Sequence, residues 1–232
     1  KRCGADAVKI QTYTADTITL NSDLPEFQIT QGPWAGRNLH DLYDEAHTPW
    51  DWHEAMFDKA RAAGITLFSS PFDSSAVDFL DDLGAPAYKI ASFEMLDFKL
   101  VEYAASKGKP IIISTGMANL SEITMLYEFL QQKKFLDFSI LHCVSGYPAE
   151  PKEYSLQNIA DMSERFNCPI GLSDHTLSNV TAVVGIAMGA SIIEKHFTMS
   201  RSDGGVDSEF SLEPIELASL CQETKIAWEA RG

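Results

Sequence analysis

The sequence lacks the features that mark membrane proteins, secreted proteins and nucleic-acid-binding proteins. No apolar run approaches the roughly 20 residues that a membrane-spanning helix needs, and no signal-peptide pattern opens the chain. Basic residues are scarce, with 18 Lys and Arg against 33 Asp and Glu. Because a nucleic-acid surface needs clustered positive charge, we do not expect nucleic acid as a partner. Because no membrane-spanning run is present, we do not expect a membrane either.

Cysteine is also scarce, and its spacing argues against a disulfide framework or a structural zinc site. The four cysteines, Cys3, Cys143, Cys168 and Cys221, lie far apart and form no CxxC pair. This spacing is typical of reduced thiols, so we expect a cytoplasmic protein. The chain does not begin with Met, and we expect that its N-terminus has been cut into.

Apolar runs alternate with amphipathic stretches along the whole chain. The runs are rich in Val and Ile without polar alternation, as strands of a sheet covered on both faces require. We expect seven such strands, at Ala7–Tyr13, Thr66–Phe72, Ala87–Ser92, Pro110–Gly116, Phe138–Ser145, Pro169–His175 and Ser191–Thr198. We expect helices near residues 50–63, 74–83, 97–107, 120–133, 155–166, 178–188 and 213–230.

Seven β/α units indicate an α/β fold and leave two architectures to choose between. A (β/α)8 TIM barrel that lacks its first strand accounts for seven units after a truncated start. An open doubly wound sheet is the alternative, but no Gly-rich phosphate loop follows the first strand. We therefore expect residues 1–232 to form one TIM-barrel catalytic domain, with the long irregular segment 14–49 as a lid or substrate loop.

Polar side chains gather where these strands end, which is where TIM barrels carry their active sites. Every strand contributes to the set, which comprises Lys9, Gln11, Ser69, Ser70, Lys89, Ser92, Glu94, Ser114, Thr115, His142, Ser145, Ser173, His175, Glu194 and His196. Convergent Lys, Ser and Thr donors suit a small anion such as a phosphate or a carboxylate.

Two lysines stand inside buried runs, where an unpaired charge is costly. Lys9 shares the inward face of its strand with Gln11, and Lys89 stands in another apolar run. Each lysine needs an anion, a Schiff-base carbonyl or, as the plain structural alternative, a neighbouring carboxylate. Because Lys89 and Ser92 cannot both point inward on a regular strand, we expect that strand to bulge or end between them.

Two histidines, His175 and His196, end the last two expected strands. Either one alone would be a core imidazole or an acid–base group as often as a ligand. Adjacent parallel strands lie roughly 4.8 Å apart, so the pair predicts a shared divalent metal. Two protein ligands leave the ion open to water and substrate, which suits Mn²⁺ or Mg²⁺ better than structural zinc. We expect Glu194 to be a partner of His196. His142 is a less certain member of the site. We expect the remaining histidines, His40, His47 and His53, at the surface.

Several longer motifs resemble the sialic acid synthase family, and together they cover nearly the whole chain. They are residues 4–13 (GADAVKIQTY), 88–94 (YKIASFE), 114–118 (STGMA), 141–143 (LHC), 173–176 (SDHT) and 194–198 (EKHFT). The resemblance implies a transferase on a (β/α)8 barrel. Such an enzyme condenses phosphoenolpyruvate with an N-acetylated amino sugar to give a nonulosonic acid, and it uses a divalent metal.

The resemblance also implies roles for individual residues. Glu94 would transfer a proton, and catalysis would further involve Lys89, His175 and His196, with both histidines binding the metal. The phosphoenolpyruvate contacts would be Lys9, Ser70, Lys89, Ser92, Ser114, Ser145 and Ser173. The sugar contacts would be Gln11, Tyr147 and Asp207. The family often carries Thr at the position of Ser70 and Asn at that of Ser145.

The loop around Asp207 points to a branch of this family. Residues 205–212 read GVDSEFSL, whereas N-acetylneuraminate synthases usually carry Gly-Pro-Asp-His followed by Ala-Ser-Leu. The Val-Asp and Phe-Ser-Leu pattern resembles the pseudaminic acid synthase branch, whose sugar is 2,4-diacetamido-2,4,6-trideoxy-L-altrose. An apolar Val206 and the missing His suit such a deoxy sugar. The N-acetylneuraminate and legionaminate branches are the alternatives.

Two parts of the family pattern are not in the sequence. One is the first strand, with a Glu and an Asn-His motif. The other is the C-terminal antifreeze-like domain, which supplies an Arg to the sugar site of the partner subunit. The resemblance therefore implies a homodimer for the full-length protein, and we expect the 232-residue chain by itself to be inactive or nearly so.

Two other functions stay open on the residues alone. A Schiff-base pyruvate aldolase would use Lys9 or Lys89, would need no metal and would form an adduct that borohydride traps. A non-catalytic barrel kept as an oligomer scaffold would require the polar groups at the strand ends to be accidental.

Overall fold

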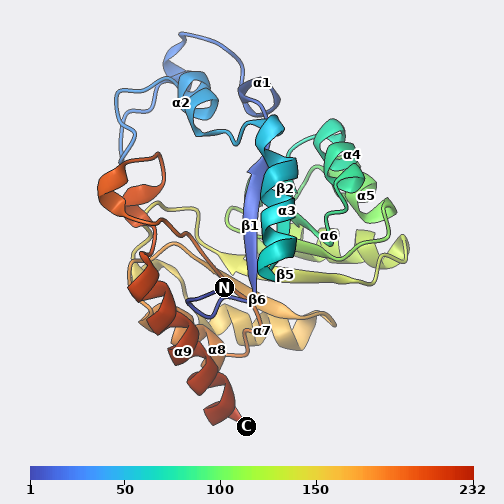
Figure 1. Ribbon diagram of the computed structural model, residues 1–232. Coiled ribbons are helices and arrows are strands. Elements are labelled where there is room, and N and C mark those ends of the chain that lie inside the picture. Colours follow the sequence, from blue (N-terminus) through green and yellow to red (C-terminus); the bar gives the residue numbers. More distant parts are fainter.

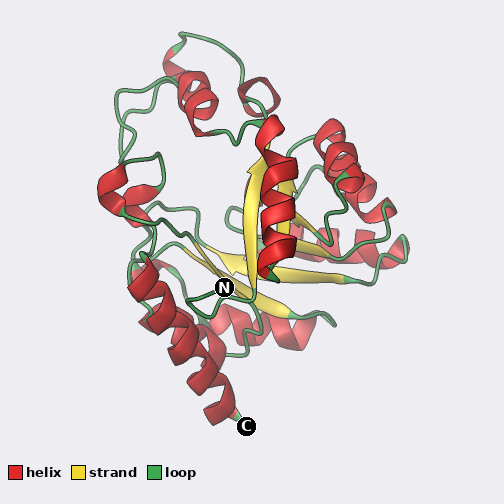
Figure 2. Cartoon of the chain, in the orientation of Figure 1, coloured by secondary structure: helices red, strands yellow, loops and turns green.

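The computed structural model describes residues 1–232, and its strands form one parallel sheet in chain order. The strands are β1 (Ala7–Thr12), β2 (Thr66–Pro71), β3 (Tyr88–Ile90), β4 (Ile111–Ser114), β5 (Phe138–Cys143), β6 (Ile170–Asp174) and β7 (Ile193–Lys195). Each strand pairs with the next, so β1 and β7 are the two edges. Figure 2 shows the sheet as a curled layer with helices outside it. This confirms the predicted TIM-barrel-like fold with one strand lacking.

Helices alternate with the strands. All but the last bury one face against the outer side of the sheet, and the last packs alongside the helix before it (Figure 1). The helices are α3 (His53–Ala63), α4 (Ser74–Asp82), α5 (Phe98–Ser106), α6 (Leu120–Gln132), α7 (Gln157–Arg165), α8 (Val180–Ala187) and α9 (Pro214–Arg231). The core between the two layers contains 28 buried residues, including Ile113 and Ile140 from the sheet and Leu126 from α6. No helix combines the length and the apolar surface needed to cross a membrane.

Local sequence sets the ends of these helices. The Asn119 side chain accepts a hydrogen bond from the Glu122 amide (3.1 Å), and the Glu122 carboxylate accepts one from the Asn119 amide (2.8 Å). This reciprocal capping box satisfies two amides that have no partner within α6. A glycine ends a different helix, α3. Its C-terminal residue is followed by Gly64, whose φ of 64° lies in the left-handed region that favours glycine.

The segment 14–49 is more ordered than the sequence predicts. It contains α1 (Ala15–Ile18), the 3-10 turn η1 (Pro25–Phe27) and the two-turn helix α2 (Leu39–Ala46), and η2 (Trp50–Trp52) follows it. In Figure 1 it arches beyond the C-terminal end of β1 and reaches toward the segment around residue 205. α2 is only eight residues long and buries Leu42 alone, so it is shorter than the stretch of sequence over which a helical pattern can be recognised.

Two other local expectations had opposite outcomes. β3 ends at Ile90 and the 3-10 turn η3 (Ser92–Glu94) follows, so the strand does end between Lys89 and Ser92. His53, by contrast, was expected at the surface and is fully buried. Its Nδ1–H donates to the Pro49 carbonyl (3.1 Å), and its Nε2 accepts from the Thr12 hydroxyl (2.8 Å). Burial lowers the pKa of His53, which is a neutral core group.

The remaining short 3-10 turns are η4 (Pro151–Glu153), η5 (Arg201–Asp203) and η6 (Ser208–Phe210). The last two lie in the loop between β7 and α9, which also carries Asp207.

Candidate active site

The register of the sheet brings most of the predicted polar residues onto one face. Gln11 of β1 lies beside Ser70 of β2, and Ser173 of β6 lies beside Glu194 of β7. Residues paired across neighbouring strands point to the same side of a sheet. Their side chains therefore face the inside of the curl, near the C-terminal ends of the strands, where the sequence analysis placed the site.

Glu194 is the electrostatic centre of this face. One of its carboxylate oxygens lies 3.1 Å from the Lys9 ammonium, and the other lies 3.1 Å from the Lys89 ammonium. The Ser173 hydroxyl donates to the same carboxylate (3.3 Å). Burial alone would raise the pKa of Glu194, but Lys89 and Lys9 hold it well below its usual range. Glu194 is thus ionised and balances one of the two lysine charges.

This arrangement contradicts the predicted partner of Glu194 and agrees with the structural alternative given for the two lysines. Glu194 was expected to be a partner of His196, yet its hydrogen bonds go to Lys9, Lys89 and Ser173. Both lysines do have a neighbouring carboxylate, as the structural alternative proposed. Two ammonium groups share that one carboxylate, however, and burial lowers the pKa of Lys89. A further anion at the site would favour the state in which both lysines are charged.

Three serine hydroxyls beside these lysines have no hydrogen-bond partner although they are buried. They belong to Ser70, one residue before the end of β2, to Ser114 at the end of β4 and to Ser145, which follows β5. Buried polar groups are almost always hydrogen-bonded, and leaving one unpaired is unfavourable. Three unpaired hydroxyls next to two lysines therefore mark the place of a small polyanionic ligand.

Gly116 allows two of the predicted serines to converge. The Gly116 amide donates to the Ser92 hydroxyl oxygen (3.0 Å). A Cβ at Gly116 would lie 2.8 Å from Ser92 Oγ and would overlap the hydroxyl of Ser145. Only glycine fits where the backbone approaches these side chains so closely. The two serines therefore lie on either side of a bare stretch of backbone.

His175 is held with one ring nitrogen free. Its Nδ1–H donates to the Val144 carbonyl (2.7 Å), and its backbone amide donates to the Tyr154 hydroxyl (2.7 Å). Burial, and then His196, lower the pKa of His175 to about 4. The ring is therefore neutral at pH 7, and its Nε2 carries an unshared lone pair.

His196 lies beside His175, as the strand order predicts. The two ring centroids are 5.3 Å apart, and the Nδ1 of His196 lies 3.4 Å from a carboxylate oxygen of Asp207. Two imidazoles with free Nε2 atoms at this separation fit a divalent ion whose other ligands are water and substrate. The structure contains no group of three or more His, Cys, Asp and Glu side chains placed to hold a metal. The histidine pair thus fits an open metal site and not a closed structural one.

Aromatic rings line the side of the site that carries the two histidines. The ring of Tyr147 packs against that of His175, tilted by 34° with 4.3 Å between the ring centroids, and it also contacts Phe210 (5.3 Å). Trp34, from the segment 14–49, contacts both Tyr147 and Phe210 at 5.9 Å, and its indole N–H donates to the Val206 carbonyl (2.8 Å). The segment 14–49, which we predicted to be a lid, therefore contacts the loop that carries Asp207, the predicted sugar contact.

Glu94 occupies the boundary between the two sides. It lies in η3, and one of its carboxylate oxygens is buried without a partner. Burial raises the pKa of Glu94 to about 7, so this carboxyl group can give or take a proton near neutral pH. Burial, and then the charges of Glu94 and Asp207, raise the pKa of Tyr43 in α2. The lid helix thus approaches both carboxylates.

Three of the polar residues at the strand ends face away from the site. Ser69 hydrogen-bonds Thr12 on the outer side (2.6 Å), Thr115 donates to the Leu141 carbonyl (3.0 Å), and His142 contacts the Tyr154 carbonyl. Sequence reasoning missed Trp34 and Phe210 because aromatic residues in loops give no periodic signal. The apolar Phe210, fully buried between two hydrophilic stretches, was the available sign.

Comparisons with known proteins agree with this geometry. The chain is 42% identical over 232 residues to the pseudaminic acid synthase of Campylobacter jejuni, covering 100% of this chain and 68% of that protein. It is 34% identical over 237 residues to the N,N'-diacetyllegionaminic acid synthase of Legionella pneumophila, covering 100% and 66%. The crystal structure of an N-acetylneuraminic acid (sialic acid) synthetase from Leptospira borgpetersenii superimposes with a TM-score of 0.88 at 31% identity, covering 100% of this chain and 76% of that one. Residues 1–232 match the NeuB family throughout, and the chain therefore belongs to that family, which confirms the resemblance carried by its motifs.

Proposed function

We propose that this protein is a pseudaminic acid synthase, a transferase that forms a carbon–carbon bond. It condenses phosphoenolpyruvate with 2,4-diacetamido-2,4,6-trideoxy-L-altrose to give pseudaminic acid and phosphate. The observation that carries the proposal is the trio of unpaired buried hydroxyls, Ser70, Ser114 and Ser145, beside two lysines that share one carboxylate. The choice of sugar is supported by the higher identity to a pseudaminic acid synthase (42%) than to a legionaminic acid synthase (34%).

The phosphoenolpyruvate subsite follows from charge and hydrogen bonding. Lys9 and Lys89 supply positive charge for the phosphate and carboxylate, while the hydroxyls of Ser70, Ser92, Ser114, Ser145 and Ser173 supply donors. Charge-assisted hydrogen bonds of this kind are strong where water is excluded. They hold the enol carbon in place and stabilise the charge that develops as phosphate leaves.

The sugar is placed between Glu94 and the histidines. Gln11, Tyr147 and Asp207 bind its polar groups, and the rings of Trp34 and Phe210 face its apolar parts. A divalent ion, Mn²⁺ or Mg²⁺, would be held by His175 and His196 and, when bound, would polarise the aldehyde oxygen of the open-chain sugar. The chain itself contributes the orientation of the aldehyde toward the enol carbon.

The reaction consumes one water molecule, whose oxygen becomes the ketone oxygen at C2. One of its protons ends on the aldehyde oxygen, which becomes a hydroxyl group, and the other leaves with the phosphate. C3 of phosphoenolpyruvate attacks the aldehyde carbon, and water adds to C2. The tetrahedral intermediate then loses phosphate by cleavage of its C2–O bond, which leaves a ketone at C2. Glu94, whose pKa is about 7, takes the proton from the attacking water.

Replacing Glu94 with glutamine is expected to lower kcat about 10²-fold, because a positioned general base contributes at least that much. In the wild type, kcat/KM should rise with pH through about 7 as the carboxyl group loses its proton. The variant should show no ionisation there. Steady-state phosphate release between pH 5.5 and 9 measures both effects. If the variant keeps the wild-type pH profile, Glu94 is not the group that takes the proton.

Replacing Trp34 with alanine is expected to raise KM for the sugar about tenfold, because the indole contacts two rings of the sugar side and latches the Val206 loop. KM for phosphoenolpyruvate should not change, since the lysine side has no contact with Trp34. Trp52, which is 59% exposed, provides the control substitution. Equal changes in both KM values would show that the lid has no preference for the sugar side.

We further propose that the protein is a cytoplasmic homodimer. Four free thiols, without any disulfide, support a reducing compartment. Light scattering on the purified protein tests the dimer.

The deciding experiment incubates the full-length protein with phosphoenolpyruvate, Mn²⁺ and each of three sugars, the precursors of pseudaminic, legionaminic and N-acetylneuraminic acid. Mass spectrometry should find a condensed product with the first sugar at the highest kcat/KM. A Schiff-base aldolase would instead give a pyruvate adduct trapped by borohydride and would tolerate EDTA. Full activity in EDTA would therefore contradict the proposal.

A further inference from the structure

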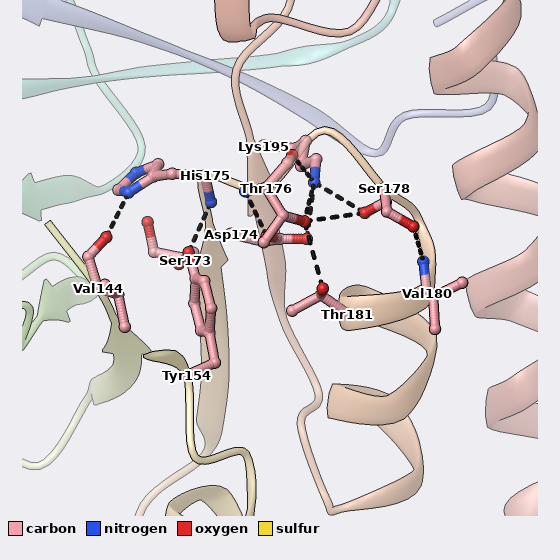
Figure 3. Close-up of polar contacts among 10 residues, drawn as sticks. All are labelled: Val144, Tyr154, Ser173, Asp174, His175, Thr176, Ser178, Val180, Thr181 and Lys195. Atoms are coloured by element: carbon pink, nitrogen blue, oxygen red, sulfur yellow. Dashed lines mark hydrogen bonds and ion pairs between the residues drawn. The ribbon is translucent and has the colours of Figure 1, made fainter. Parts of the chain in front are cut away.

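A buried ion pair joins the two strands that carry the histidines. The Lys195 ammonium lies 2.7 Å from a carboxylate oxygen of Asp174, and their side chains are 3% and 0% exposed. The two residues are directly opposed in the last pair of the ladder between β6 and β7. Each stands one position before a histidine, His175 or His196, so it points to the other face of the sheet. In Figure 3 the His175 ring and the Lys195 ammonium indeed extend to opposite sides.

Lys195 also binds the backbone on the far side of His175. Its ammonium donates to the carbonyls of Thr176 and Ser178, the latter at 3.2 Å. The other carboxylate oxygen of Asp174 accepts from the Thr176 amide (2.8 Å). Figure 3 shows these contacts converging on one ammonium group. A single side chain from β7 therefore holds the chain both before and after His175.

The position of this pair matters because the ladder stops there. β6 ends at Asp174 and β7 ends at Lys195, so neither histidine is included in the strand pairing. The backbones of His175 and His196 bond instead to separate segments, at Ala149 and Leu212. The Asp174–Lys195 pair is the last contact between the two strand ends before the imidazoles.

Stability alone gives little reason to bury these charges. A buried ion pair is often no more stabilising than an apolar pair of the same size, because desolvation offsets the attraction. Its advantage is directional, since the carboxylate and carbonyl oxygens fix the ammonium in one place.

We propose that Asp174 and Lys195 are positioning residues that set the separation of the His175 and His196 imidazoles and thereby the affinity of the site for its divalent ion. The inference rests on the proposed function, because it presupposes that the two histidines bind the ion. Neither residue touches substrate. Both act through the backbone that carries the ligands, as groups behind metal ligands commonly do.

The test measures Mn²⁺ binding to the full-length protein without substrates, by the electron paramagnetic resonance signal of free Mn²⁺. Lys195→Met replaces the ammonium with an uncharged chain of similar length. Asp174→Asn removes the negative charge and leaves one acceptor oxygen where Lys195 and Thr176 now use two. Each is expected to raise the Kd for Mn²⁺ about 10- to 100-fold, the usual range for residues behind metal ligands. The double variant should be no weaker than the weaker single variant, because the two residues act as one unit.

A second readout separates positioning from general damage. The Mn²⁺ concentration for half-maximal turnover should rise with the Kd, while KM for phosphoenolpyruvate stays within about twofold of the wild type. Lys109→Met is the matched control, because it breaks an ion pair with Asp81 on the outer side of the fold. It should leave Mn²⁺ binding unchanged.

Three results would overturn the proposal. Wild-type Kd values in a folded Lys195→Met or Asp174→Asn variant would show that the pair does not act on the ligands. An equal rise in KM for phosphoenolpyruvate would show general damage. If Lys195→Met does not fold, Asp174→Asn decides alone. If wild type and His175→Ala bind Mn²⁺ equally, the metal assignment itself fails, and the positioning role fails with it.

Discussion

Replacing His175 or His196 with alanine is expected to lower turnover about 10⁴-fold, because polarisation of the aldehyde by a bound ion is worth several kcal/mol. Each ring offers a free Nε2, and the ring centroids are 5.3 Å apart. One remaining imidazole would hold a divalent ion too weakly to be useful. Millimolar Mn²⁺ should therefore not restore the rate. Steady-state phosphate release over a range of Mn²⁺ concentrations measures this.

The control for the histidine variants is His47→Ala. The His47 ring bonds the carbonyl of Asp44 near the surface, away from the sheet. This variant should retain wild-type turnover and Mn²⁺ dependence. Recovery of the His175→Ala or His196→Ala enzyme by added metal would indicate that the ion has other ligands. If the wild-type enzyme turns over at the same rate after its metal is removed, the ion has no part in the reaction.

Replacing Lys89 with methionine is expected to lower kcat/KM for phosphoenolpyruvate about 10³-fold, because donors aimed at developing charge in a buried site contribute that much. Lys89 is almost fully buried and shares Glu194 with Lys9. Without the Lys89 ammonium, Glu194 neutralises Lys9, and no second ammonium is left to bind the anion. Folding should be retained, because methionine fills the same space and Glu194 keeps one partner.

The measurement for Lys89→Met is kcat/KM together with the binding of phosphoenolpyruvate by calorimetry. Lys107→Met is the control, since Lys107 pairs with Asp78 on the outer side of α5. A Schiff-base aldolase that used Lys89 would lose its borohydride-trapped adduct in this variant. A variant that binds phosphoenolpyruvate as well as the wild type would place the anion elsewhere.

Much of the fold could be predicted because the strands are buried on both faces. All seven expected strands are present, each within its predicted range, since a continuous apolar run can hardly be stable elsewhere. Strand alternation also placed Lys9 and Glu194 on the inner face correctly. The helix α2 escaped prediction because its eight residues make only two turns within a long polar segment, which is too short a stretch for a helical pattern to stand out.

The partners within the site were harder to predict than its members. Alternation fixes the face on which Glu194 lies, but the curl of the sheet decides which side chain it meets across the interior. The nearest histidine in the sequence, His196, was the natural guess, whereas the actual partners come from β1 and β3. His53 was misplaced for a similar reason, because its burial depends on the packing of α3 against Thr12.

Lys9 and Glu194 stand on β1 and β7, the two edges of the sheet, so their ion pair also ties one margin of the fold to the other. An anion that recruits the Lys9 ammonium competes with this tie. By thermodynamic linkage, any change that strengthens the contact between β1 and β7 must also change the affinity of the site for the anion. Amide hydrogen exchange in β1 and β7 should therefore respond to phosphoenolpyruvate, which makes the closure of the barrel part of its substrate binding.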